Sequence, residues 1–341
     1  GTPNDIINLA KALEVTLHQG VDPIRGCPHG LNLGAPEDFD TFDKLFAAYQ
    51  KQAEYFTQIA ARHHALVYAA IRESAPMLMM SLLMDDCVSR ARPGIDGGLR
   101  YLAGTYETYG NITVSDSFVA IRELVYEKRL FSLKELVAML DADFAGYEAQ
   151  RELMLRCPKF GNGNGQADDM ARRVNDHIFD FVARQAAPNG LSSYLVVMIN
   201  NGANADLGRN TLATADGRHA RTYLSNGNNP MAGMDREGLL AMLRSMASTR
   251  ACCTAGTAQN LKLSRELFDH HAQAVNDLID TAFELGILSL NVSVMNKGDM
   301  EDALIHPQRH QNLFVRVGGF SARFIDLDYD TQQDVLHRTI Y

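Results

Sequence analysis

The chain has 341 residues, of which 46% are hydrophobic and 21% are charged. That length suits one large domain or two ordinary ones, and the composition is that of a well-packed globular protein. The formal net charge of −9 argues against a surface that binds nucleic acid or anionic membranes in general. Because neither a long apolar run nor a signal-peptide pattern occurs, we expect a cytoplasmic protein.

The N-terminal segment predicts a helix that starts at Asn4 or Asp5 and ends at Gly20, since apolar residues recur between them at helical spacing. Proline and glycine then dominate residues 21–37, which predicts turns. A long helix with one apolar face is expected over 40–75.

Helical and extended patterns alternate over the rest of the chain. Strands separated by helices predict an α/β architecture, and a barrel is one form of it. Further helices are predicted over 115–128, 132–144, 166–184 and 264–285, and strands over Leu191–Asn200, Ile287–Val294 and Leu313–Val317.

The five cysteines lack the spacing of a zinc site or of a disulfide framework, so a reducing compartment is expected. Cys87 and the adjacent pair Cys252-Cys253 are interpreted as small buried hydrophobic residues, the usual state of free cysteine. The methionine run 77–80 is likewise interpreted as core, and the glycine-asparagine run 161–165 as a turn.

Two histidine pairs lie within helical patterns, where adjacent side chains point apart. We therefore interpret them as surface or core histidines and not as metal ligands. The pairs are His63-His64 and His270-His271.

A glycine pair, Gly318-Gly319, separates two short extended runs near the C-terminus, and by itself it predicts a turn. The surrounding segment 315–324 (VRVGGFSARF) resembles the signature of the glycyl radical enzymes. The resemblance implies that Gly319 stores the radical. Glycine suits this role because a Cα radical is planar, and a side chain would oppose that geometry. Residues that would support the loop are Arg316, Gly318, Phe320, which replaces the commoner tyrosine, and Ser321.

The resemblance extends along most of the chain and is closest to the dehydratase and decarboxylase branch of that family. It implies the second half of a ten-stranded barrel over 1–213 and a glycine radical domain over 214–341. Asn291, Asp216 and Arg218 would line the barrel or its site. The blocks that carry the resemblance are 81–101, 115–117, 120–122, 159–162, 216–218, 291–292 and 306–307.

Members of the family pass the radical from glycine to a cysteine, usually in a Gly-Cys-Val-Glu-like motif. That motif would precede a helix resembling residues 7–14, whereas this sequence begins at Gly1. We therefore expect the cysteine to lie on an N-terminal half-barrel polypeptide, which is either a separate subunit or was cut away.

By resemblance, the function is that of a glycyl radical lyase acting on a small molecule, with no cofactor bound in turnover. A radical S-adenosylmethionine activase with an iron–sulfur cluster would install the radical, and the complete enzyme would be a homodimer that binds neither nucleic acid nor membrane. One alternative is a non-catalytic spare subunit that donates a fresh glycyl radical to a damaged enzyme. Another, anaerobic ribonucleotide reductase, would require a zinc-binding cysteine quartet between residues 253 and 341, which the sequence lacks.

Overall fold

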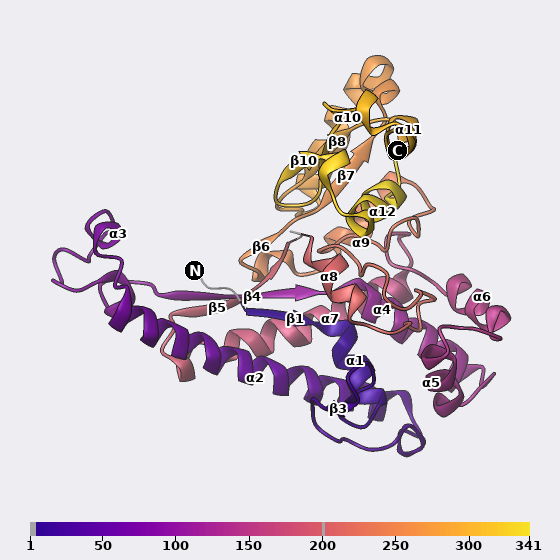
Figure 1. Ribbon diagram of the computed structural model, residues 1–341, viewed down its shortest axis with the longest axis horizontal. Helices are drawn as coiled ribbons and strands as arrows, with labels where there is room; N and C mark the ends of the chain where they lie inside the picture. The colour runs from indigo at the N-terminus through magenta and orange to yellow at the C-terminus, as the bar shows by residue number, and fades with distance from the viewer. Residues whose placement is uncertain (1–4, 200–201) are drawn as a thin grey trace.

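The computed structural model describes residues 5–199 and 202–341. Its largest sheet has four parallel strands in the order β1-β4-β5-β6, connected and covered by helices (Figure 1). Parallel strands need such crossover helices, so the predicted α/β class is confirmed. The strands are β1 (Asp5–Asn8), β4 (Ala103–Tyr109), β5 (Ser193–Met198) and β6 (Gly256–Thr257).

The other described strands form two-stranded sheets. β7 and β8 are parallel, whereas the other two pairs are antiparallel. The pairs are β2 (Val21–Asp22) with β3 (Cys27–Pro28), β7 (Asn260–Leu263) with β8 (Asn291–Val294), and β9 (Phe314–Arg316) with β10 (Ser321–Arg323).

The helices pack around three hydrophobic clusters. The largest cluster joins the four-stranded sheet to α1, α2, α4, α5 and α7, and every residue of α4 is buried. The second lies between α9, α10 and β7, and the third lies beneath β9 and α12. The helices are α1 (Leu9–Leu17), α2 (Phe42–Ser74), α3 (Leu78–Leu82), α4 (Asn111–Ile121), α5 (Leu133–Asp141), α6 (Glu148–Arg156), α7 (Gly165–Arg184), α8 (Ala203–Arg209), α9 (Leu239–Ala247), α10 (Arg265–Glu284), α11 (Lys297–Ile305) and α12 (Tyr329–His337).

The predicted N-terminal helix is wrong in its first turn, because residues 5–8 form β1 and pair with β4. This tertiary pairing satisfies backbone groups that a helix would otherwise have satisfied. The helix begins at Leu9, where the Asn8 side chain accepts a hydrogen bond from the Lys11 amide at 3.0 Å. Asn4 lies outside the described residues.

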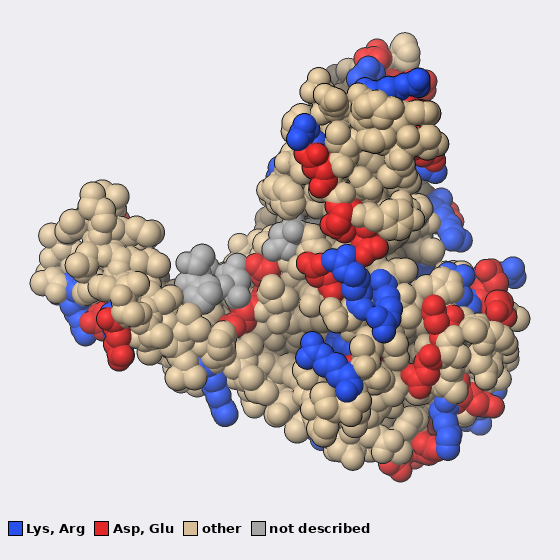
Figure 2. All heavy atoms as spheres, viewed as in Figure 1, with Lys and Arg blue, Asp and Glu red and all other residues tan. Residues whose placement is uncertain are grey.

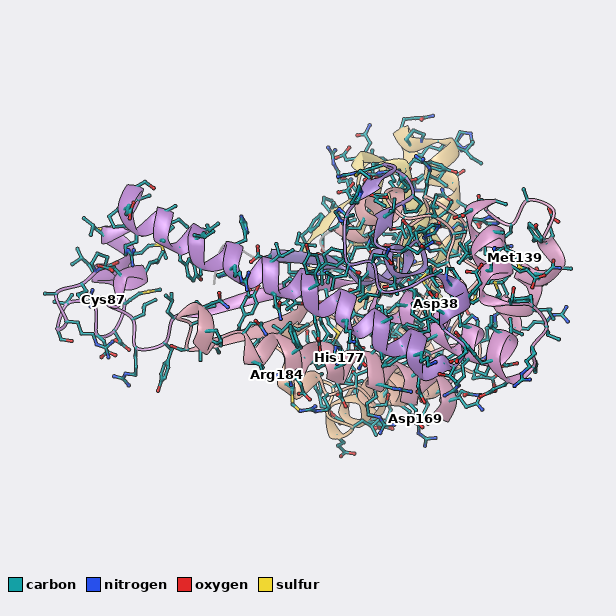
Figure 3. All side chains as sticks on the ribbon, turned by 90° about the horizontal axis from the view of Figure 1, so that it is seen from below. Asp38, Cys87, Met139, Asp169, His177 and Arg184 are labelled. Carbon is teal, nitrogen blue, oxygen red and sulfur yellow. The ribbon has the colours of Figure 1, made fainter. Side chains whose placement is uncertain are left out.

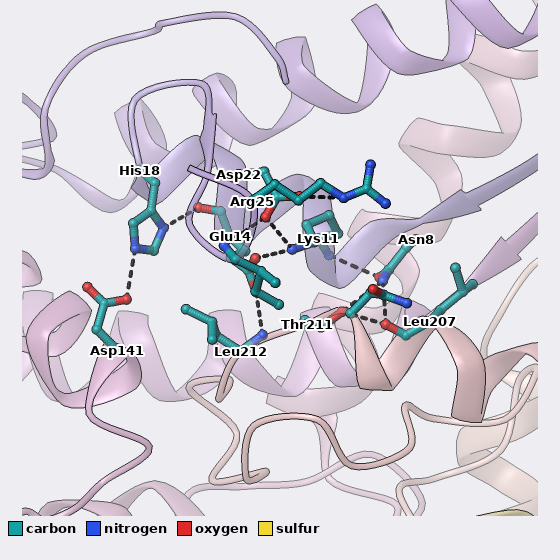
Figure 4. Close-up of polar contacts among 12 residues, drawn as sticks. Asn8, Lys11, Glu14, His18, Asp22, Arg25, Asp141, Leu207, Thr211 and Leu212 are labelled. Atoms are coloured by element: carbon teal, nitrogen blue, oxygen red, sulfur yellow. Dashed lines mark hydrogen bonds and ion pairs between the residues drawn. The ribbon is translucent and has the colours of Figure 1, made fainter. Parts of the chain in front are cut away.

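Polar contacts fix α1 to the rest of the body (Figure 4). Lys11 Nζ lies 3.1 Å from the Asp22 carboxylate and also contacts Glu14. Glu14 in turn accepts a hydrogen bond from the Leu212 amide at 2.6 Å. Burial raises the pKa of Glu14 despite the nearby ammonium group of Lys11. These contacts join the start of the chain to the segment that follows α8.

Several predicted elements are confirmed with small shifts in their ends, namely α2, α5, α7, α10 and the hairpin strand β9. The helix expected over 115–128 begins at Asn111 and is π-helical over 122–127. β5 lies within the expected range 191–200, whose last residue is outside the described part.

The strand expected over 287–294 is confirmed only in its second half, because β8 begins at Asn291. The Ile287 amide donates to the carbonyl of Ala282 at 3.1 Å and so completes the end of α10. The residues just after Gly286 therefore close a helix instead of pairing with a strand.

The C-terminal end of α2 and residues 75–102 form a lobe that projects from the body (Figures 1 and 3). The prediction that Met77–Met80 fill a core is wrong, since Met79 is 73% exposed and its neighbours are also exposed. The run begins α3 at the end of this lobe, where few other residues pack against it. Cys87 is buried there, as predicted, and the lobe surface seen in Figure 2 is mainly uncharged. None of the described helices is both long and apolar enough to cross a membrane.

Candidate functional site

The glycine pair lies at the tip of the β9–β10 hairpin. Arg316 pairs with Ser321 in antiparallel register, which leaves residues 317–320 as the connecting loop. The Val317 amide donates to the Phe320 carbonyl at 3.1 Å and closes this loop. Gly318-Gly319 is therefore part of a turn between two strands, as the local sequence predicts, and the two glycines are the central residues of that turn.

The two sides of the hairpin have different environments. Val315 and Val317 are buried against the third hydrophobic cluster, beside Val335 of α12. Gly319 and Phe320 are exposed, and Phe320 presents 44% of its surface. The hairpin is thus fixed to the body on one side, and the edge that carries Gly319 is open.

Three of the predicted site residues lie together at the base of this loop. The Arg316 guanidinium donates to Asn291 Oδ1 on β8 and to Ser321 Oγ on β10, each at 3.4 Å. Arg316 therefore joins the two strands of the hairpin to the end of the neighbouring parallel pair. These contacts restrict how the loop can tilt relative to β8.

Arg338, just after α12, also contacts the hairpin. Its Nη1 donates to the carbonyl oxygen of Arg316 at 3.2 Å, and its Nη2 lies 2.6 Å from Asp334. Asp334 is buried and accepts a further hydrogen bond from Asn204 at 3.2 Å. The sequence predicts no role for Arg338, although an Asp and an Arg four residues apart at the end of a helix are a recognisable ion-pair pattern.

Lys262 on β7 contacts the C-terminal end of α12, next to Arg338. Its buried Nζ donates to the carbonyls of Val335 and Arg338, the latter at 3.4 Å, at the C-terminal end of α12. A cation is favourable there because the last carbonyls of a helix carry partial negative charge. Desolvation, together with the positive charge of Arg338, lowers the pKa of Lys262 to about 7.

The C-terminal tail completes the anchoring of α12. The Tyr341 amide donates to the Lys262 carbonyl at 3.1 Å, and the Ser264 amide donates to the Tyr341 carbonyl at 2.6 Å. Asp235 accepts hydrogen bonds from the hydroxyls of Thr339 and Tyr341, each at 2.5 Å. The last residues of the chain are therefore held like an added strand beside β7.

Asp216 and Arg218 belong to a separate buried turn. The guanidinium of Arg218 donates to Thr214 Oγ1 at 3.1 Å and to the Thr222 carbonyl at 2.7 Å. The Asp216 amide donates to Ser117 Oγ at 3.2 Å. Burial lowers the pKa of Arg218 to about 10, although Asp216 opposes this shift. These contacts stabilise the turn itself. None of them involves Arg316, Asn291 or Ser321, so the structure does not bring Asp216 and Arg218 together with those residues.

The histidine pair on α2 consists of one surface and one core residue, as predicted, since His63 is exposed and His64 is buried, but the side chains do not diverge. Instead of pointing apart, His63 Nδ1 and His64 Nδ1 lie 2.8 Å and 3.0 Å from the carboxylate oxygens of Asp5. Adjacent helical residues can reach one acceptor here because Asp5 lies over the helix on β1. His270 and His271 are exposed, and the backbone at His271 departs from helical geometry. Within residues 5–199 and 202–341, no three His, Cys, Asp or Glu side chains are placed to hold a metal ion.

The predicted burial of the adjacent cysteines is wrong for Cys252, which is exposed, and only partly right for Cys253, which is half-buried. They lie in a short 3₁₀-helix, 251–253, just before β6, where a surface turn leaves the first side chain in solvent. Residues 161–164 of the run 161–165 form a turn, as predicted, and Gly165 begins α7.

Comparison with protein-family models gives two matches. Residues 2–204 match the pyruvate formate lyase-like model, and residues 224–325 match the glycine radical model, which includes Gly319. The predicted domain boundary between residues 213 and 214 falls between the two matches and stays a prediction.

Curated relatives are similar over nearly the whole chain. Trans-4-hydroxy-L-proline dehydratase of Clostridioides difficile is 29% identical, over 98% of this chain and 42% of the relative. Isethionate sulfite-lyase of Bilophila wadsworthia is 29% identical, over 97% of this chain and 41% of the relative. The chain thus spans about two fifths of the length of these relatives.

Solved structures show the same fold. Hydroxyproline dehydratase from Clostridioides difficile with substrate bound superposes with a TM-score of 0.95 at 28% identity, covering 98% of this chain and 43% of the other. The glycerol-bound form of the B12-independent glycerol dehydratase from Clostridium butyricum gives 0.93 at 28% identity, with the same coverages. The chain belongs to the pyruvate formate lyase-like family of glycyl radical enzymes.

Proposed function

We propose that this chain is the radical-bearing part of a glycyl radical lyase and that Gly319 stores the radical. The observation that carries the proposal is the placement of Gly319. It lies at the open tip of a hairpin whose base is fixed by Arg316 and Arg338, within the segment that matches the glycine radical model. A Cα radical needs a residue without a side chain, in a loop that can enter a reaction chamber.

The other components come from outside the described chain. A radical S-adenosylmethionine activase with an iron–sulfur cluster would oxidise Gly319, and the radical would pass to a cysteine on an N-terminal half-barrel polypeptide. The resulting thiyl would abstract hydrogen from a small substrate and start dehydration, decarboxylation or a related C–O, C–N or C–C cleavage. Relatives include dehydratases and a decarboxylase by name.

The exposed edge of the hairpin supports a covering partner. Water and oxygen divert an organic radical, so Gly319 and Phe320 must be enclosed during turnover. We propose that the partner half-barrel closes over this edge, and that the complete enzyme is a cytoplasmic homodimer. In this account Asp216 and Arg218 stabilise the barrel wall, and Asn291 positions the loop.

Anaerobic co-purification followed by activation tests the proposal. We expect the chain to bring down a polypeptide with a Cys-Val-Glu-like motif, or to regain lyase activity when that half is supplied. Turnover should then require both the activase and Gly319. If the chain instead restores activity to a complete, oxygen-damaged enzyme without adding its own active site, it is a spare radical donor and the lyase proposal fails.

A further inference from the structure

Cys252 and Cys253 form an accessible pair of thiols that the radical chemistry does not use. Both are free; Cys252 is exposed, and Cys253 is half-buried against the main hydrophobic cluster. Their sulfur atoms lie 4.0 Å apart. Two thiols that face each other at the surface can act together on a single ligand atom.

Arg250 fixes the position of the second sulfur. Its Nη2 donates to Cys253 Sγ at 3.3 Å, while its Nη1 lies 3.3 Å from Asp180 and 3.5 Å from Asp176 on α7. The hydrogen bond to Cys253 raises the pKa of Arg250, so the guanidinium stays charged beside the sulfur. A cationic group next to a thiol is the setting in which cysteine becomes reactive.

The backbone of the turn is also fixed. The Cys253 amide donates to the Arg250 carbonyl at 2.9 Å, and the Thr254 amide donates to the Ala251 carbonyl at 3.0 Å. The next residue, Ala255, donates to Val196 of β5 at 2.8 Å. A ligand that bridges the two sulfurs therefore meets a site that is already ordered, which reduces the entropy lost on binding.

The sulfur separation indicates the kind of ligand. Adjacent Cα atoms across a trans peptide lie about 3.8 Å apart, which is shorter than the span of about 4.4–6.8 Å in an unstrained disulfide, so a disulfide between these neighbours would be strained. A soft atom bonded to two thiolates at about 2.3 Å holds them about 3.8 Å apart when its bond angle is tetrahedral, and closer when the centre is pyramidal and trivalent. The observed 4.0 Å is slightly longer than either span, so a small rotation of the exposed Cys252 side chain brings the sulfurs to chelating distance. Because this site supplies only two thiols, the other bonds of the ligand's central atom must be to groups that the ligand already carries.

We propose that Cys252 and Cys253 form a chelating dithiol site for a soft, thiophilic trivalent centre, of which an organic arsenoxide is the model. In the reaction, arsenic forms two As–S bonds and loses its oxo oxygen. The two thiol protons leave with that oxygen as water, and the oxidation state of arsenic stays the same. This site is independent of Gly319 and of the proposed lyase activity.

The test uses phenylarsine oxide with the purified chain, together with any companion that co-purifies, and intact-mass detection. We expect one adduct that withstands excess monothiol and is removed by a dithiol. Cys252→Ser and Cys253→Ser should each abolish it, because one thiol holds arsenic only weakly. Cys27→Ser removes an exposed cysteine that has no cysteine next to it in the sequence, and it should leave the adduct unchanged.

Arg250→Gln should leave the adduct in place but make it exchange faster with monothiol, since the sulfur is less firmly held. Far-UV circular dichroism of each serine variant checks that the fold is retained. An adduct that persists in both serine variants, is lost in Cys27→Ser, or is removed by monothiol from the unsubstituted protein would overturn the proposal.

Discussion

The guanidinium of Arg338 donates a hydrogen bond to the carbonyl oxygen of Arg316 at 3.2 Å and so connects the end of α12 to the base of the glycine hairpin. The same guanidinium is paired with buried Asp334. Lys262 holds the carbonyl of Arg338 from the other side. The position of Gly319 therefore depends on contacts made about twenty residues farther along the chain.

Arg338→Ala should destabilise the protein and shorten the lifetime of the radical. Removing the guanidinium leaves Asp334 buried without its cation, which costs about 3–5 kcal/mol in comparable buried pairs. Arg338→Lys keeps the charge but loses the two-pronged geometry, so its effect should be intermediate. The measurements are thermal unfolding and the decay of the electron paramagnetic resonance signal after activation.

Arg323→Ala is the matched control for Arg338. It removes an exposed arginine of the same hairpin, paired with Asp326 at 2.7 Å, and surface pairs contribute about 0–1 kcal/mol. If Arg323→Ala shortens the radical lifetime as much as Arg338→Ala does, the link through the Arg316 carbonyl has no special role.

Arg316 and Asn291 should be energetically coupled across the gap between the hairpin and β8. A double-mutant cycle with Arg316→Ala and Asn291→Ala isolates this contact, and we expect about 0.5–1.5 kcal/mol from the free energies of unfolding. The 3.4 Å separation of the two groups places the value toward the lower end. Additive effects of the two substitutions would show that Asn291 does not position the loop.

Asp116→Asn should change how stability depends on pH. Asp116 is fully buried and accepts a hydrogen bond from the Phe160 amide at 2.9 Å. Desolvation raises its pKa to about 7 from an ordinary value of 3.8, although Lys159 opposes this shift. Between those pH values the folded chain holds a proton that the unfolded chain releases. The contribution of this group to stability is thus full below about pH 4 and is lost as pH rises toward 7.

The free energy of unfolding of Asp116→Asn, compared with that of the unsubstituted protein, should therefore be higher at pH 8 than at pH 5. Between pH 5 and pH 8 this difference should change by at most about 3 kcal/mol, because the folded-state pKa of about 7 lies about two units above pH 5 and each unit corresponds to about 1.4 kcal/mol. Urea unfolding at the two pH values measures it. An equal difference at both would mean that Asp116 does not titrate in this range.

The projecting lobe should promote self-association of the isolated chain. Met79 and Leu83 are 73% and 80% exposed, and apolar patches of this kind bind partners or cause aggregation. Charging them in Met79→Glu and Leu83→Glu should lower the apparent mass in sedimentation velocity at high protein concentration. Ser89→Glu, in the same lobe, supplies the control. Association that is unaffected by the two apolar substitutions would place the contact elsewhere.

The sequence predicted the parts of the fold whose signals are local. The helical patterns over 40–75, 132–144 and 166–184 were sufficient to place α2, α5 and α7, and in the structure Thr41 and Ser132 cap the first two. The first strand was missed because its pairing partner, β4, lies about a hundred residues away, and no pattern within 5–8 reports such a partner.

The glycine motif of the candidate site could be predicted from the sequence, whereas the residues that hold the hairpin in place could not. The glycine motif lies in ten consecutive residues, and Asn291 is a prediction from the resemblance. Lys262 and Arg338 were not assigned roles because their function arises only when β7, α12 and β9 meet in space. Exposure was the least predictable property, as Met79 and Cys252 show, because it depends on what packs over each residue.

The most direct test of the central claim is the electron paramagnetic resonance spectrum of the protein after anaerobic activation. We predict a doublet from a glycine-centred radical that is absent in Gly319→Ala and still present in Gly318→Ala, the neighbouring glycine of the same turn. Deuterated glycine should collapse the doublet, because its splitting comes from the remaining Cα hydrogen. A doublet that survives Gly319→Ala, or a chain that stays radical-free with a competent activase, would contradict the account.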